Sequence, residues 1–459
     1  MFRRTRRGNR SVYVKAYLIL VCAVWLVGAV CLLWNGAVDD GAEVSPAARH
    51  APAPQARADA GGAAGLAARG GGWGAELRAR YDPNAVEPAD VLFLWVNGTD
   101  PAHIAAYERA TGRRMTAAAM RRFRDYGTLR FGVRSVEKFV PFMRRLHIVT
   151  SGQVPSWWNP ANPRGRIVTH EEIFVTKEDD ENDIDRNNNV GNNNNNNNNN
   201  DNGNSDSSAT TTTRPKTKSK PISGALPTFN SNAIEANLRN VPGLAKYVLY
   251  LNDDFLVGAP LALSDFVDLR SGLLRLNMGG FVAPNDRGMR TNIWHRSVGH
   301  ANTLVNSVYH PGSPRAPHQY AGHVCYFLDR DVLEHMHAMW PAEFLATSRR
   351  KFRDGNDTSL PFLMVNVALE ERLGTRGSPI TSGYATWTHR HRQNVAAWDR
   401  LVAAHAKCLC IQDGFEDSPS VDAEVAFLER KLCQMFPEKS SFERPDEPNP
   451  CDKYKDVTD

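Results

Sequence analysis

The stretch YVLYLNDDFLVG, residues 247–258, gives the clearest indication of the fold. Its first five residues are mostly apolar and predict a buried strand. The strand runs into Asn252, Asp253 and Asp254, and apolar residues resume at Phe255. Two adjacent acids therefore interrupt an otherwise buried segment. The neighbouring segments indicate what role these two acids have.

Short apolar runs alternate with helical patterns on both sides of this stretch. Strands are predicted at 90–97, 146–152, 166–170 and 247–251, and helices at 128–140 and 232–240. Strands separated by helices predict an α/β fold, a Rossmann-like and mostly parallel sheet with helices on both faces. Polar ligands collect at the carboxyl ends of such strands. The predicted rim contains Asn97, Asp100, Thr150, Ser151, Gly152, Asn252, Asp253 and Asp254.

The acid pair on this rim predicts a metal site. Asp253 and Asp254 offer hard oxygen ligands for a divalent cation, Mg or Mn, which would neutralise the phosphates of a bound nucleotide. The same residues also fit a turn with a helix cap. An ordinary nucleotide-sugar glycosyltransferase would have a similar acid pair. The motif alone leaves these alternatives open.

The start of the chain predicts a membrane anchor. A basic segment at 1–15 precedes an apolar run at 16–34, which is about as long as a helix that crosses a bilayer. With the basic flank in the cytosol, the remainder faces the lumen of the Golgi or endoplasmic reticulum. A cleaved signal peptide is the alternative. The length of the run and its end at Leu32-Leu33-Trp34 favour a single-pass anchor.

Composition divides the rest of the 459-residue chain. Residues 35–80 are rich in Ala, Gly, Pro and Arg and predict a flexible stem. The Asn-rich insertion at 177–220 is a low-complexity segment, and the tail at 444–459 is polar and predicted to be poorly ordered. Because 42% of the residues are hydrophobic, the remaining segment, 81–443, can form one large domain.

The cysteines outside the apolar run are odd in number, so at least one has no partner within the chain. Their spacing does not match a usual zinc site, which favours disulfide or core cysteines. No pairing follows from the sequence. These residues are Cys325, Cys408, Cys410, Cys433 and Cys451.

Four further segments, taken in order with YVLYLNDDFLVG, resemble the conserved regions of the Stealth family of sugar-phosphate transferases. They are DVLFLWVNGTDP, RRFRDYGTLRFGVRSVEKFVPFMRRLHIVTSGQVPSWWNP, HVCYFLDRDVLEHMHAMWPAEF and KCLCIQDGFEDSPSVDAEVAFLERKLCQMFPEKSSFE. The resemblance runs from Asp90 to Glu443, apart from the Asn-rich insertion. The layout is closer to the compact microbial members than to the animal GlcNAc-1-phosphotransferase subunit.

The resemblance implies a reaction. Family members transfer a hexose-1-phosphate, such as GlcNAc-1-phosphate or mannose-1-phosphate, from a nucleotide sugar to a hydroxyl of an acceptor glycan. A phosphodiester forms and a nucleoside monophosphate leaves. The expected partners are the nucleotide-sugar donor, the glycan or glycoconjugate acceptor and the membrane, with no nucleic acid. The sequence leaves the donor sugar, the acceptor and the oligomeric state open.

The implied chemistry depends on positioning, charge neutralisation and a base. His323 matches a histidine of the family's third conserved region and is the expected base, beside Asp253 and Asp254 as metal ligands. Arg290 is a further catalytic candidate. Asn97, Gly98 and Asp100 would bind the nucleotide, because glycine lets the backbone approach a ligand closely. The expected phosphate-binding arginines are Arg124, Arg130, Arg134 and Arg287.

Each of these assignments has a plainer alternative. Arg130 and Arg134 also fit a solvated helix face with Glu137 as their partner. Trp157 and Trp158 fit packing against the sheet better than stacking on a ligand. Glu343, Arg353 and Asp357 would orient the site or bind the acceptor. For the whole chain, the alternatives are a metal-dependent glycosyltransferase that releases a nucleoside diphosphate, or a non-catalytic lectin or scaffold.

Overall fold

The structure is a computed structural model that describes residues 72–177, 219–282, 292–416 and 418–455. The predicted anchor at 16–34 lies outside the described residues, as do most of the stem and of the Asn-rich insertion. Within the described ranges, none of the helices combines the length and the apolar character that a bilayer span needs.

A five-stranded sheet forms the centre of the domain, in the order β11-β6-β1-β2-β3. Neighbouring strands among β6, β1, β2 and β3 pair in parallel, and β11 pairs antiparallel with β6. The α/β class and the mostly parallel sheet are therefore confirmed. The strands are β1 (Ala89–Leu94), β2 (Met143–Thr150), β3 (Gly165–Thr169), β6 (Tyr247–Asn252) and β11 (Tyr326–Asp329).

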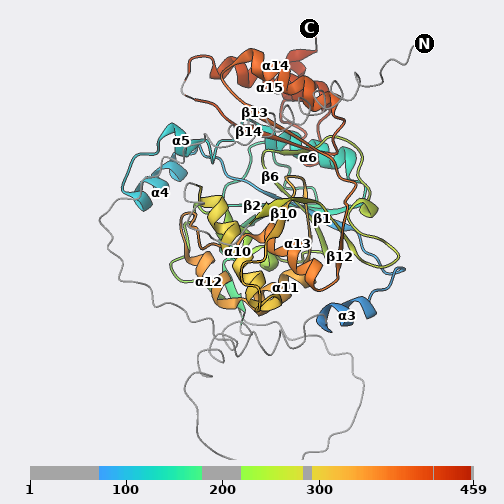
Figure 1. Cartoon of the computed structure of the whole chain (residues 1–459). Coiled ribbons are helices and arrows are strands. Elements are labelled where there is room, and N and C mark those ends of the chain that lie inside the picture. The colour runs from blue at the N-terminus through green and yellow to red at the C-terminus, as the bar shows by residue number, and fades with distance from the viewer. Residues whose placement is uncertain (1–71, 178–218, 283–291, 417, 456–459) are drawn as a thin grey trace, which may run out of the picture. The chain divides into compact units, whose positions relative to one another are not determined.

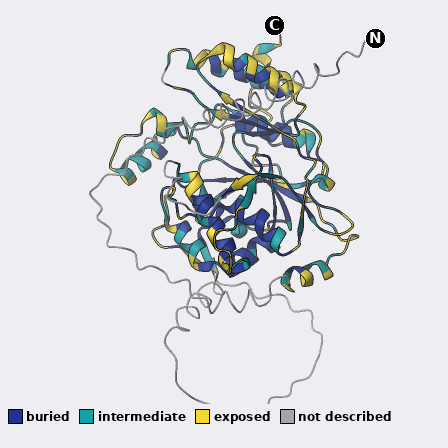
Figure 2. Cartoon of the chain, in the orientation of Figure 1, coloured by how far each residue is buried: buried dark blue, intermediate teal, exposed yellow. Residues whose placement is uncertain are grey.

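Helices flank this sheet, as the sequence predicted. Helix α6 (Thr128–Phe139) is buried from its first residue to Val136 (Figure 2). Its Gly132 allows a close approach, because a Cβ atom there would lie 3.1 Å from the Phe93 ring of β1. Figure 1 shows α6 on one side of the strands and a group of four helices on the other. That group is α10 (Ile293–Tyr309), α11 (Arg330–Met339), α12 (Pro341–Arg349) and α13 (Leu360–Glu370).

A second, three-stranded sheet begins where the first one ends. Strand β7 (Phe255–Val257) follows β6 after only two residues, and it pairs antiparallel with β14 (Cys408–Asp413). Strand β13 (Ser382–Trp387) extends this sheet on the other side of β14. The turn Asp253–Asp254 thus joins the two sheets. The amide of Ile411 donates to the Asp254 carbonyl at 2.9 Å and holds β14 against the turn.

The remaining elements are short helices, small β-ribbons and the C-terminal helices. The helix predicted at 232–240 is split into α9 (Ser231–Glu235) and the 3-10 turn η1 (Leu238–Asn240). The other helices are α3 (Gly72–Ala79), α4 (Pro101–Thr111), α5 (Ala117–Met120), α7 (His170–Ile173), η2 (Leu263–Asp265), α14 (His391–Ala403), α15 (Val421–Met435) and η3 (Pro450–Tyr454). The other strands are β4 (Val175–Lys177), β5 (Ser219–Pro221), β8 (Leu274–Leu276), β9 (Met278–Val282), β10 (His318–Ala321) and β12 (Gly374–Arg376).

Two disulfides fasten the C-terminal third of the domain. Cys325 bonds to Cys408 at the start of β14, and Cys433 of α15 bonds to Cys451. Cys410 is a free, buried thiol. The preference for disulfide or core cysteines over a metal site is confirmed, and one cysteine of the five is left over, as an odd number requires.

Candidate functional site

The turn Asp253–Asp254 lies at the carboxyl end of β6 and is partly exposed. Burial raises the pKa of Asp254 to about 6. Burial also raises the pKa of Asp253, and the charges of Asp254 and Asp125 raise it further. One carboxylate oxygen of Asp254 accepts a hydrogen bond from the Cys410 thiol at 3.4 Å. The other, Oδ1, is buried without a hydrogen-bond partner.

Asp125 adds a third carboxylate, which the sequence analysis did not single out. It lies just before α6 and accepts hydrogen bonds from the Trp95 indole at 2.8 Å and the Thr128 hydroxyl at 3.1 Å. Burial raises its pKa. Asp125 and the turn Asp253–Asp254 come from separate segments, and their negative charges repel one another near the unpartnered Oδ1 of Asp254. The chemistry of these donors suits a divalent cation, because such an ion prefers hard oxygen ligands and negative charge.

His323 lies beside this turn, in the connection between β10 and β11. Its ring centroid is 5.1 Å from the ring of Phe255, the residue directly after Asp254, and 5.3 Å from the ring of Tyr384 on β13. The protein around the imidazole partly desolvates it and lowers its pKa, although the residue reaches the surface. His323 is therefore neutral at pH 7 and can accept a proton.

Glu235, at the end of α9, is a second acid that the sequence analysis missed. Its carboxylate lies 2.8 Å from the Tyr250 hydroxyl, which is also 2.9 Å from the side-chain oxygen of Asn252. Burial raises the pKa of Glu235 to about 7, against the opposing influence of the Tyr250 hydrogen bond and the Arg353 charge. Since Asn252 precedes the acid turn, Glu235 belongs to the same rim. Its sequence signal was weak, because it is a single acid within a mostly polar predicted helix.

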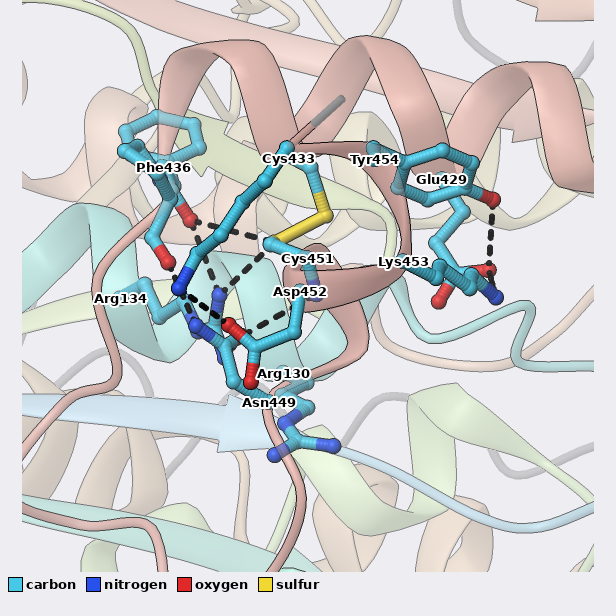
Figure 3. The surroundings of a disulfide bond; sticks show 12 residues. Arg130, Arg134, Glu429, Cys433, Phe436, Asn449, Cys451, Asp452, Lys453 and Tyr454 are labelled. Atoms are coloured by element: carbon cyan, nitrogen blue, oxygen red, sulfur yellow. Dashed lines mark hydrogen bonds and ion pairs between the residues drawn. A yellow bond between two sulfur atoms is a disulfide. The ribbon is translucent and has the colours of Figure 1, made fainter. Parts of the chain in front are cut away.

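Arg130 and Arg134 of α6 turn away from solvent into a buried ion pair. Glu443 contacts Arg130 Nε at 2.5 Å and Arg134 Nε at 2.6 Å. Arg134 also donates to the Phe436 carbonyl at 2.9 Å, next to the Cys433–Cys451 disulfide (Figure 3). The solvated-face alternative is wrong, because both arginines are buried. Their predicted contact with a nucleotide stays a prediction, and their observed contacts fasten the C-terminal segment to α6.

Three predicted site arginines remain, namely Arg124, Arg287 and the catalytic candidate Arg290, and the structure describes the first of them. Arg124 forms a bidentate pair with Asp413 at the end of β14, with N–O distances of 2.7 and 3.0 Å. This contact also joins the α6 region to the second sheet. Arg287 and Arg290 lie outside the described residues.

The predicted nucleotide residues Asn97, Gly98 and Asp100 lie at the carboxyl end of β1, as expected, and shape the loop there. Asp100 caps α4 through the Ala102 amide at 2.8 Å, and its second oxygen accepts from Gln153 at 2.7 Å. A Cβ atom on Gly98 would lie 2.3 Å from the Phe123 carbonyl, so only glycine fits there. Nucleotide contact by these residues stays a prediction.

The tryptophan, acids and arginine that were named as further site candidates have mainly structural contacts. Trp158 is buried and stacks on Phe442 with 6.0 Å between ring centroids, which supports the packing alternative. Asp357 is buried and accepts from Asn230 at 2.9 Å. Glu343 pairs with His300 at 3.2 Å. Arg353 donates to the Ser231 hydroxyl at 2.8 Å and lies close enough to Glu235 to lower its pKa.

Comparison with known protein families identifies conserved regions in this chain. Three models of Stealth proteins match it: conserved region 1 at 87–115, conserved region 2 at 122–182 and 215–273, and conserved region 3 at 322–366. The chain belongs to the Stealth family. Asp125, Glu235 and the turn Asp253–Asp254 lie within the second Stealth region, and His323 lies within the third. The resemblance of residues 407–443 to a further Stealth region stays an expectation.

The relatives of this Stealth protein are named polysaccharide phosphotransferases. An exopolysaccharide phosphotransferase of Streptomyces coelicolor is 28% identical over 362 residues, which cover 78% of this chain and 52% of the relative. A receptor polysaccharide phosphotransferase of Streptococcus oralis is 23% identical over 77% of this chain and 98% of its own. A capsular polysaccharide phosphotransferase of Neisseria meningitidis serogroup A is 25% identical over 77% of this chain and 57% of the relative. The chain spans about half the length of the first of these relatives.

Proposed function

We propose that this protein transfers a hexose-1-phosphate from a nucleotide sugar to a hydroxyl of an acceptor glycan. The proposal rests above all on one observation: Asp254 has a buried, unpartnered carboxylate oxygen on a rim that also carries Asp253, Asp125 and His323. The names of these three relatives, each a polysaccharide phosphotransferase, support the same class of reaction.

Asp253 and Asp254 would hold a divalent cation, Mg or Mn, and Asp125 would add negative charge nearby. When bound, such a cation neutralises charge on the donor diphosphate. The chain's own contribution is to hold the turn and Asp125 in place. The backbone bond from Ile411 to the Asp254 carbonyl fixes the turn, and the Trp95 and Thr128 contacts fix Asp125.

The reaction itself exchanges one phosphorus–oxygen bond for another. The acceptor oxygen forms a bond to the phosphorus attached to the sugar, and the bond from that phosphorus to the nucleoside monophosphate breaks. In this proposal the neutral imidazole of His323 receives the acceptor's hydroxyl proton. Glu235, with a pKa of about 7, is another group on the rim able to exchange a proton near neutral pH.

The nucleotide product tests the proposed reaction. The purified chain is incubated with a panel of uridine and guanosine nucleotide sugars, a glycan acceptor and Mg or Mn, and the products are separated by chromatography. Release of nucleoside monophosphate together with a phosphodiester-linked glycan is expected. Release of nucleoside diphosphate alone would instead identify a glycosyltransferase, since attack at the sugar carbon leaves both phosphates on the nucleoside.

Substitution of His323 tests its role as the base. His323→Gln is expected to lower kcat by about 100-fold, because glutamine cannot accept the acceptor's proton. The KM for the donor should change little, since the ring is assigned to the acceptor. His405→Gln, an exposed histidine after α14, is the matched control and should retain full activity. Equal activities of the two variants would remove His323 from the mechanism.

We also propose that the domain faces the lumen of the Golgi or endoplasmic reticulum, held by the apolar run at 16–34. The disulfides Cys325–Cys408 and Cys433–Cys451 support an oxidising compartment, because structural disulfides are rare in the cytosol.

A further inference from the structure

A second cluster of metal-binding residue types lies outside the proposed catalytic rim. His310 follows the last residue of α10, His318 begins β10, and Glu370 ends α13. Glu370 Oε1 lies 2.9 Å from His310 Nε2 and 3.6 Å from His318 Nε2. One possible ligand atom from each residue lies within 4.8 Å of the others. Three elements that are separate in the sequence thus converge on one point.

The proton positions on His318 can be assigned from its neighbour. The amide nitrogen of Asn302, a fully buried residue of α10, donates to the carbonyls of Val282 and Ala316, both at 3.2 Å. Its oxygen therefore faces His318 Nδ1 at 2.5 Å and can only accept. His318 Nδ1 must carry the proton. In the neutral ring, the lone pair of Nε2 then points toward Glu370. Metal-binding histidines are commonly oriented in this way, by a carbonyl oxygen that accepts the N–H of the other ring nitrogen.

The loop between the two histidines is held at several points. Asn306, one turn after Asn302, donates to the carbonyls of Pro314 and Ala316 at 3.2 and 3.0 Å. The Ser313 amide donates to the His310 carbonyl at 2.8 Å. Next to this loop, Tyr309 donates to Glu371 at 2.8 Å and fastens the end of α10 to the end of α13. The loop backbone and the His318 ring are therefore held by contacts that do not depend on a metal.

The spacing and chemistry of the three ligands match zinc. Bonds of about 2.0–2.1 Å in a tetrahedral site place neighbouring ligand atoms about 3.3 Å apart, between the two N–O distances observed here. Two imidazoles and one carboxylate suit zinc and similar transition metals rather than Mg. The carboxylate of Glu370 contributes a negative charge, which favours a cation.

We propose that His310, His318 and Glu370 bind a zinc-class divalent cation, with a fourth position open to water. This ion would connect α10, β10 and α13. His323 lies five residues after His318, so the ion would also stabilise the strand that leads to the proposed base. The site is independent of the phosphotransferase proposal, because it uses other residues and a different class of metal.

Binding of zinc chloride to the full chain, stripped of metal with a chelator, tests this site. Calorimetry should detect one zinc equivalent that is lost in His318→Ala or weakened at least about 100-fold. The same zinc should raise Tm by about 3 to 5 °C in the unaltered chain. Cobalt provides a spectroscopic check, since coordination by two imidazoles produces a visible absorption band.

The variants are chosen so that loss of folding cannot imitate loss of binding. His310→Ala removes a side chain that is 33% exposed, and circular dichroism checks its fold. His300→Ala is the matched control, because His300 pairs with Glu343 in the same way and is absent from the cluster. Zinc that binds equally well to His310→Ala, His318→Ala and the unaltered chain would overturn the proposal. So would a stripped chain that binds no zinc.

Discussion

Replacing Asp254 with asparagine is expected to lower kcat by about 1000-fold, the upper range for loss of one group that stabilises transition-state charge. Asparagine has nearly the same shape and keeps one oxygen, but it removes the negative charge from the proposed metal site. The Mg or Mn concentration needed for half-maximal activity should rise as well. Monophosphate release measured across a metal titration checks both effects.

Stability measurements distinguish this effect from unfolding. Burial raises the pKa of Asp254 to about 6, so its charged form is less favourable in the folded protein than in the unfolded chain. Removing that charge should leave Tm unchanged or raise it, a common trade between activity and stability. Asp268→Asn, in a turn that is partly exposed, is the control and should retain full activity. An Asp254→Asn protein with normal turnover would refute the assignment of this carboxylate.

Replacing Glu443 with glutamine is expected to lower the free energy of unfolding by about 3–5 kcal/mol, because two buried arginines then lose their carboxylate. Arg130 and Arg134 both contact Glu443, whose side chain is fully buried. Chemical denaturation monitored by tryptophan fluorescence checks the value. Glu447→Gln is the control: Glu447 lies 3.9 Å from Arg130 and is partly exposed, so its loss should cost less than about 1 kcal/mol.

The effect of Glu443 should depend on pH with a definite sign. Burial alone would raise its pKa, but the hydrogen bonds from Arg134 and the Ser440 amide outweigh burial and hold the pKa below the usual 4.5. A lowered pKa in the folded state stabilises the protein above pH 4.5, and this contribution is lost as the pH falls through the folded value. The difference between Glu443→Gln and the unaltered chain should therefore shrink in acid. A difference that is constant from pH 7 to pH 3 would contradict this explanation.

The parts of the fold that could be predicted are those with local periodicity. Strands β1 and β6 are mainly apolar runs, β2 and β3 contain shorter ones, and α6 has a regular helical pattern, so each was recognisable from its own residues. The second sheet was not. Strand β7 has only three residues, and its partner β14 begins about 150 positions later, at Cys408. Such a pairing leaves no pattern in either segment.

The same distinction applies to the site. Asp253 and Asp254 stand out because they interrupt a strand, whereas Glu235 and Asp125 acquire their significance only from neighbours brought together by folding. The arginines of α6 show the opposite error. Their helical spacing predicted a shared polar face, but their partner Glu443 is 309 residues from Arg134 in the sequence. No local rule could have indicated that they are buried.

The position of the acid turn between two sheets has a practical consequence for truncated versions of this protein. One of its flanking strands, β7, is completed by β14, which also provides the thiol beside Asp254 and the amide that binds its carbonyl. A fragment that stops before Lys407 would retain all three matched Stealth regions and yet leave β7 as a bare edge beside the acids. Shortened versions intended for assays should therefore include the residues from Lys407 onward.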